Sequence, residues 1–158
     1  VESEPGVGTT FHVLIPATHP MVQGQTVRDA TALPVRRIVL VEDEEAVASG
    51  LKTLLEMDGF EVEVARTGQD AIPVIERFKP GVVVLDIGLP DCDGTEVFAR
   101  IEERWPGLPV LFSSGHADAG QLEELLRRKH VGLLIKPYDY DRLRNALRPL
   151  LKASEAVA

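Results

Sequence analysis

The sequence predicts an α/β fold: a five-stranded, doubly wound parallel sheet with helices on both faces. From Arg36 onward, short apolar and β-branched runs alternate with stretches that have the spacing of amphipathic helices. The run Val82–Leu85 is continuously apolar, as in strands that are covered on both sides. Regular alternation with short connections indicates parallel strands joined by right-handed crossovers.

Each element follows from a local pattern. The expected strands are Ile38–Val41, Val62–Ala65, Val82–Leu85, Val110–Phe112 and Leu133–Ile135. Helical spacing marks the first, fourth and fifth helices at Val47, Leu51, Leu54 and Leu55, at Leu122, Leu125 and Leu126, and at Leu143, Leu147 and Leu150. In the second helix the Thr67 hydroxyl forms a cap with Asp70, and Pro73 is expected to kink the helix or shorten its first turn. The third helix is Thr95–Arg104, ahead of Pro106-Gly107.

The first 35 residues lie outside this alternation. Residues 1–17 contain a Gly-rich piece, Pro5–Thr10, which reads as a turn before a short strand, Phe11–Ile15. Residues 18–35 have no sustained periodicity and are expected to be a linker. The folded domain is expected to span residues 36–152, followed by a short Ala-rich tail, 153–158.

Composition excludes several classes of protein. The 158 residues are 44% hydrophobic and 27% charged, which is typical of a globular protein, and no apolar run is long enough to span a bilayer. The net charge of −8 argues against a nucleic-acid surface. Cys92 is the single cysteine, so an internal disulfide and a cysteine-based zinc site are excluded, and a reducing cytoplasm is expected.

Polar residues follow four of the five predicted strands. They are Glu42 and Asp43, then Asp86, then Ser113 and Ser114, and finally Lys136. In a parallel sheet these positions share the carboxyl edge, so three carboxylates are expected around one hollow with a hydroxyl and an ammonium. Clustered carboxylates repel and need a cation, and oxygen-only ligands suit Mg²⁺. The set is typical of phosphoryl transfer to a carboxylate nucleophile.

The order of these motifs resembles the receiver domain of two-component response regulators. The motifs are Val41-Glu42-Asp43, Leu85-Asp86-Ile87-Gly88-Leu89-Pro90 with Asp93-Gly94, Pro109-Val110-Leu111-Phe112-Ser113-Ser114-Gly115, and Lys136-Pro137. The resemblance covers residues 36–152 and implies the flavodoxin-like strand order 2-1-3-4-5.

The resemblance also implies a role for each matched residue. Asp86 would be the phosphoacceptor, Ser114 the switch hydroxyl and Lys136 the cation that binds the phosphoryl group. Mg²⁺ would be bound by Glu42, Asp43, Asp86 and the main-chain carbonyl of Gly88. The Lys136–Pro137 bond is expected to be cis. Leu133 departs from the family, which often has a signalling aromatic three residues before the lysine.

A second resemblance concerns the amino-terminal segment. Residues Glu4–Pro16 resemble the final glycine box and closing strand of a sensor histidine kinase ATPase domain. Residues 1–17 would then be a remnant of that domain, and the chain the carboxyl-terminal piece of a hybrid histidine kinase. The expected partners are the kinase domain of the parent protein and a histidine phosphotransfer protein, without nucleic acid or direct membrane contact. The domain would phosphorylate itself and lose the phosphoryl group slowly, and would not be a turnover enzyme.

Two alternatives compete with this reading. Asp91-Cys92-Asp93-Gly94-Thr95 spells the D-x-D-G-T signature of haloacid-dehalogenase-like phosphatases, with Asp91 as the nucleophile. Against it, Asp91 follows Pro90, which cannot donate in a central strand ladder. The other alternative is a phosphorylation-dead interaction module, which the intact set of strand-end residues argues against. Cys92 is expected to be an inert thiol, and no metal site is expected at the histidines, including His116 beside Ser114.

Overall fold

The computed structural model describes residues 2–4, 8–10, 37–115 and 122–155 of the chain. The chain divides into two compact units, Val1–Thr31 and Ala32–Ala158. The expected tail, 153–158, is described only as far as Glu155, where the last helix ends.

Among the described residues of the first unit, β1 (Glu2–Glu4) pairs antiparallel with β2 (Gly8–Thr10). The prediction of a turn through Thr10 is therefore wrong at its end, because the β-branched residues Thr9 and Thr10 favour a strand. The predicted strand Phe11–Ile15 and the predicted linker lie outside the described residues.

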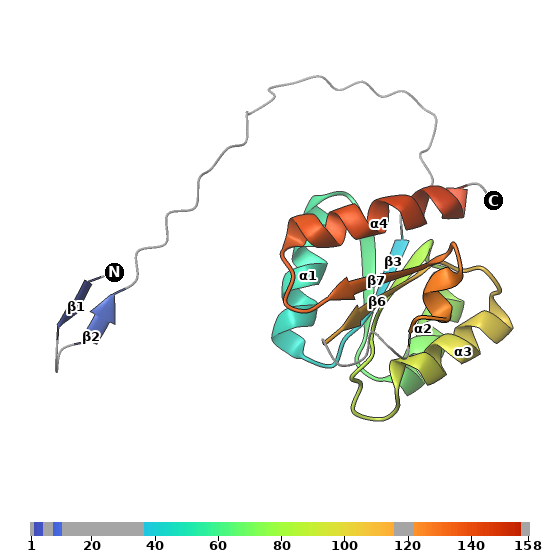
Figure 1. Cartoon of the computed structure of the whole chain (residues 1–158), viewed down its shortest axis with the longest axis horizontal. Coiled ribbons are helices and arrows are strands. Elements are labelled where there is room, and N and C mark those ends of the chain that lie inside the picture. Colours follow the sequence, from blue (N-terminus) through green and yellow to red (C-terminus); the bar gives the residue numbers. More distant parts are fainter. Residues whose placement is uncertain (1, 5–7, 11–36, 116–121, 156–158) are drawn as a thin grey trace, which may run out of the picture. The chain divides into compact units, whose positions relative to one another are not determined.

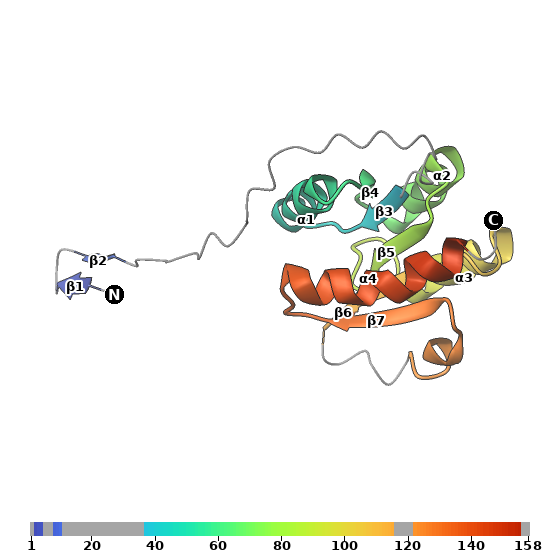
Figure 2. The ribbon, with the colours of Figure 1, turned by 90° about the horizontal axis from the view of Figure 1, so that it is seen from above.

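The second unit is built on a five-stranded parallel sheet in the order β4-β3-β5-β6-β7 (Figure 1), which confirms the expected fold and strand order. The strands are β3 (Arg37–Val41), β4 (Glu61–Ala65), β5 (Val82–Asp86), β6 (Val110–Ser114) and β7 (Val131–Ile135). Figure 2 shows them following one another from β4 to β7 across the sheet. Every residue of β5 and β6 is buried, as expected for central strands covered on both faces.

In the part of this unit that the structure describes, four α-helices cover the two faces of the sheet. They are α1 (Glu45–Met57), α2 (Gly68–Phe78), α3 (Gly94–Arg104) and α4 (Tyr140–Glu155). On one face α2 and α3 pack against Val39 and Val41 of β3. On the other face α1 and α4 pack against Ile38 and Leu40. The alternation of side chains along β3 thus feeds two separate apolar layers.

The expected fourth helix is absent from residues 122–130, where the structure has one 3₁₀ turn, Leu125–Arg127. The Leu126 amide donates to the Leu122 carbonyl as in an α-helix, but the Arg128 amide then donates to the nearer Leu125 carbonyl. Arg128 already has extended backbone angles (φ −81°, ψ 132°), so the turn ends there. Buried Leu122 and half-buried Leu125 explain the apolar spacing without a regular helix.

The second helix begins where the sequence predicts. Thr67 is the N-cap of α2, its hydroxyl oxygen accepts from the Asp70 amide at 3.1 Å, and the hydroxyl donates to the Asp70 carboxylate at 2.7 Å. Pro73 lies inside the helix and does not shorten its first turn.

Candidate functional site

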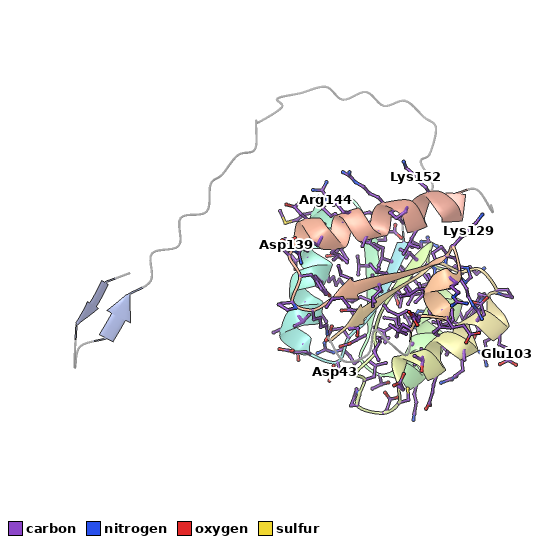
Figure 3. All side chains as sticks on the ribbon, viewed as in Figure 1. Asp43, Glu103, Lys129, Asp139, Arg144 and Lys152 are labelled. Carbon is purple, nitrogen blue, oxygen red and sulfur yellow. The ribbon has the colours of Figure 1, made fainter. Side chains whose placement is uncertain are left out.

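The strand register brings the predicted polar residues to one edge of the sheet. Leu85 of β5 is level with Val41 of β3, and Asp86 is level with Ser113 of β6. Ser114 is level with Ile135 of β7, so Lys136 follows at the same edge. Asp43, labelled in Figure 3, lies in the loop between β3 and α1 at this edge.

Lys136 joins two of the carboxylates. Its ammonium donates to Asp86 Oδ2 at 2.7 Å and to Glu42 Oε2 at 3.1 Å. Asp86 and Glu42 are buried, with 8% and 2% of their surface exposed, so both carboxylates depend on this cation. Burial alone would lower the pKa of Lys136, but the hydrogen bonds to Asp86 and Glu42 outweigh it and raise the pKa, so the side chain is an ammonium at neutral pH.

Three carboxylates form the acidic cluster. One oxygen each of Glu42, Asp43 and Asp86 can be chosen so that all three lie within 4.8 Å of one another. Burial raises the pKa of Glu42, and the Asp86 charge adds to this effect while Lys136 opposes it. With one ammonium against three carboxylates the cluster retains a charge near −2, and its oxygen donors suit a hard divalent cation.

The end of β6 links Asp86 to Lys136 through the main chain. The Ser113 carbonyl accepts from the Ile87 amide at 3.1 Å, and the Ser114 carbonyl accepts from the Lys136 amide at 2.7 Å. The buried Ser114 hydroxyl donates to the Gly115 carbonyl at 2.7 Å. The Lys136–Pro137 peptide is cis, which confirms that prediction.

A contact that the sequence did not predict lies beside this strand end. Ser113 Oγ donates to the Tyr138 hydroxyl at 3.1 Å. Strand alternation places Ser113 on the face opposite Ser114, and Tyr138 packs with the apolar layer of α1 and α4 on that face. The only sequence signal was the position of Tyr138, two residues after Lys136.

Asp91 is positioned as a helix cap. Its two oxygens accept from the main-chain amides of Gly68 and Gln69 at the first turn of α2, at 2.9 and 3.0 Å. The Gly68 hydrogen bond is the main reason that the pKa of Asp91 is lowered. Asp91 thus serves the amino terminus of α2, whereas Asp86 ends a buried strand, so the geometry does not support the phosphatase alternative.

Asp93 caps α3, and Gly94 lies against the backbone of Asp86. Asp93 is the N-cap of α3 and accepts from the Thr95 amide at 2.7 Å. At Gly94 an added Cβ would lie 2.6 Å from the Asp86 carbonyl oxygen and 2.7 Å from Ile87 Cα, so only glycine fits. Asp93-Gly94 therefore shapes the start of α3, as expected, and also packs against the candidate nucleophile.

Three further predicted features have different outcomes. Gly88 donates its amide to Asp86 Oδ1 at 3.2 Å, which places it beside the cluster. Burial, followed by the charges of Asp91 and Glu96, raises the pKa of the half-buried Cys92 thiol, which agrees with an inert thiol. His116 lies outside the described residues.

Comparison with known proteins establishes the family. The family model of the response regulator receiver domain matches residues 38–148, so the chain belongs to this family. TrcR of Mycobacterium tuberculosis, a transcriptional regulatory protein, is 36% identical over 118 residues, and regulatory protein LuxO of Vibrio cholerae is 34% identical over 122 residues. Each match covers 75% of this chain but only 46% of TrcR and 27% of LuxO, so the chain spans less than half of either relative.

Solved structures agree with this assignment. A CheY-like receiver domain protein from Methanospirillum hungatei has a TM-score of 0.71 at 27% identity, and the match covers 78% of this chain and 99% of that one. The receiver domain of a LuxO repressor protein from Vibrio parahaemolyticus has a TM-score of 0.70 at 30% identity, covering 77% and 94%. The chain is thus a receiver domain of two-component signalling. Within the described part of the chain, none of the helices has the length and apolar character needed to cross a membrane.

Proposed function

We propose that this domain accepts a phosphoryl group on Asp86 from a phosphorylated histidine of a kinase. The observation that carries the proposal is the position of Lys136, whose ammonium bonds both the strand-end carboxylate and its acidic neighbour. A nucleophilic carboxylate with a fixed cation beside it suits attack on an anionic phosphoryl group.

In the transfer, an oxygen of the Asp86 carboxylate attacks phosphorus. The new O–P bond forms as the P–N bond to the donor imidazole breaks, and the electron pair of that bond stays on the imidazole nitrogen. Lys136 binds a phosphoryl oxygen and Ser114 changes its hydrogen-bond partner to another. Bound by Glu42, Asp43, Asp86 and the Gly88 carbonyl, Mg²⁺ would neutralise charge on the phosphoryl oxygens.

The acyl phosphate is lost by slow hydrolysis. Water attacks phosphorus, the acyl O–P bond breaks, and the products are orthophosphate and the free Asp86 carboxylate. The domain therefore turns over only its own modification. The change of partner at Ser114 shifts an equilibrium between two arrangements of the β6 end, which a protein partner senses.

The parent protein that we propose is a cytoplasmic or membrane-tethered hybrid histidine kinase. The support is the resemblance of residues 4–16 to the end of a kinase ATPase domain; the relatives named above are regulatory proteins. The partners would be the kinase domain and a histidine phosphotransfer protein. We expect the domain to act through these protein contacts and not through nucleic acid.

Incubation with Mg²⁺ and acetyl phosphate tests the proposal by intact-protein mass spectrometry. We expect one phosphoryl adduct that is absent in Asp86→Asn and without Mg²⁺, and retained in Asp91→Asn. Repeated release of phosphate that depends on Asp91 would establish the phosphatase instead. Absence of both adduct and turnover would establish the passive interaction module.

A further inference from the structure

A hydrogen bond between side chains joins the connection between β7 and α4 to the end of β6. Ser113 Oγ donates to the Tyr138 hydroxyl at 3.1 Å. Ser113 is 1% exposed and Tyr138 is half-buried, so water competes little for this hydrogen bond. Burial raises the pKa of Tyr138, and the phenol is neutral at physiological pH.

This contact closes a ring of interactions around Lys136. The Lys136 amide donates to the Ser114 carbonyl at 2.7 Å, and Tyr138, two residues later, bonds the neighbouring Ser113. The segment from Lys136 to Tyr138 is therefore attached at both ends to a pair of adjacent residues. The Ser113 carbonyl also accepts from Ile87, so the same pair holds the chain next to Asp86.

The ring matters because a lysine side chain is long and flexible. Holding an ammonium at a fixed point costs rotamer entropy, and any freedom of the backbone below it adds to that cost. A reacting group that is misplaced by a fraction of an ångström loses much of its effect on rate. Fixing the backbone on both sides of Lys136 limits where its ammonium reaches.

We propose that Tyr138 is a positioning residue for phosphoryl transfer. Its hydroxyl, through Ser113, holds the β7–α4 connection so that Lys136 stays at the Asp86 carboxylate and at the phosphoryl group that Asp86 accepts. The inference rests on the proposed function of Asp86. It assigns a function to a residue that neither contacts the phosphoryl group nor binds the metal.

The test removes the hydroxyl alone. The ring of Tyr138 lines a groove with Leu51 and Leu54 of α1, so Tyr138→Phe preserves this packing while deleting the hydrogen bond. We expect the rate of Asp86 phosphorylation by acetyl phosphate in saturating Mg²⁺ to fall about fivefold, the equivalent of about 1 kcal/mol. Ser113→Ala should give the same loss, and the double variant should be no slower than either single variant.

Tyr140→Phe is the matched control. The Tyr140 hydroxyl donates to the Leu54 carbonyl at 2.9 Å and also interacts with Asp58, at the end of α1 and away from the strand ends. Its loss should lower thermal stability about as much as Tyr138→Phe and leave the phosphorylation rate unchanged. An equal rate loss in Tyr140→Phe would overturn the inference, because it would mean that general loosening slows the reaction.

A second background tests whether Tyr138 acts through Lys136. In Lys136→Met the residual rate should be the same with and without Tyr138→Phe. A further fivefold loss in that background would show a route independent of Lys136 and overturn the inference. If the wild type forms the adduct and Tyr138→Phe forms it at the same rate, the inference fails while the proposed function stands. A wild type that forms no adduct overturns both.

Discussion

Three aspartates within one short segment have three different tasks, and the difference lies in the donors that each one meets. Asp86 ends β5 and meets the Lys136 ammonium at 2.7 Å. Asp91 accepts from two main-chain amides of α2, and Asp93 accepts from the amide and the hydroxyl of Thr95 at the start of α3. Asp91 and Asp93 cap helices, whereas Asp86 lies beside an ammonium that can also bind a phosphoryl oxygen, so Asp86 is the one suited to accept a phosphoryl group.

At the residue scale the tightest steric constraint on Asp86 comes from Gly94. Gly94→Ala places a methyl group 2.6 Å from the Asp86 carbonyl oxygen, so the main chain must shift. We expect a loss of about 1–3 kcal/mol of unfolding free energy, as in other overpacked sites, and slower phosphorylation because Asp86 moves. Urea unfolding and the acetyl phosphate assay measure the two effects.

Gly50→Ala provides the opposite control for Gly94→Ala. Gly50 lies within α1 and an added Cβ there meets nothing within 4 Å. The same substitution should therefore stabilise the domain by about 1 kcal/mol through helix propensity, without changing the phosphorylation rate. If Gly94→Ala proved as harmless as Gly50→Ala, the close packing of α3 against Asp86 would not constrain the site.

At the element scale, the strands and their polar ends could be predicted, but the contacts between loops could not. Continuous apolar runs such as Val82–Leu85 define strands locally, and parallel register then places Asp86 and Lys136 at one edge. The partner of Asp91 is 23 residues away at Gly68, in a loop whose path depends on the folded sheet. The hydrogen bond between Ser113 and Tyr138 likewise depends on the packing of α4.

The error in the fourth helix has a related cause. Leu122, Leu125 and Leu126 have helical spacing, yet spacing reports only which residues face the core. Here the amides of Arg127 and Arg128 donate to carbonyls only three residues back, at Glu124 and Leu125, so the backbone does not complete α-helical turns. The same periodicity predicted α1 and α4 correctly, where the helices run over 13 and 16 residues.

The cap at α2 gives a pH prediction for an element. The lowered pKa of Asp91, due first to the Gly68 amide, means that its contribution to stability is present above the unfolded value near 3.8. That contribution is lost as pH falls through the lower folded pKa, where the carboxyl is protonated in both states. We expect Asp91→Asn to lower Tm at pH 7 and to have much less effect at pH 2–3.

Thermal unfolding followed by circular dichroism across this pH range measures the effect of Asp91→Asn. Glu76→Gln removes one charge from the exposed side of the same helix and serves as the control, with little change expected at either pH. A Tm loss in Asp91→Asn that did not depend on pH would contradict the cap as described, because it would reflect packing and not the ionised carboxylate.

At the scale of the whole molecule, the clustered carboxylates and the Lys136 ammonium that partly balances their charge lie at the same edge of the sheet. Two apolar layers on either side of the sheet leave only its carboxyl edge for buried polar groups, and Glu42, Asp86, Ser113 and Ser114 are the buried polar residues of the described chain. All four lie at that edge. The stability of the domain is therefore coupled to the occupancy of one site.

This coupling predicts a stability that depends on Mg²⁺ and on pH. A ligand that binds only the folded state stabilises it by about 2.7 kcal/mol at roughly 100 times its Kd, so Mg²⁺ should raise Tm by several degrees at pH 7.5. The raised pKa of Glu42 means that protons compete with the metal, so the Mg²⁺ effect should shrink as pH falls toward 5. In the metal-free domain the pH dependence of stability has the opposite sign. The raised pKa of Glu42 favours the folded state at low pH, and that contribution is lost as pH rises from 4.5 through the folded pKa.

Differential scanning fluorimetry with and without Mg²⁺ at pH 5 and 7.5 separates these two contributions. Asp43→Asn should abolish most of the Mg²⁺-dependent rise and leave the metal-free Tm nearly unchanged, because Asp43 is exposed and belongs to the cluster only through its carboxylate. Glu42→Gln should raise the metal-free Tm at pH 7.5 by removing a buried charge, while weakening Mg²⁺ binding. An Mg²⁺-dependent rise in both variants equal to that of the wild type would place the cation elsewhere on this acidic protein, and the charge balance at the carboxyl edge would then depend on Lys136 alone.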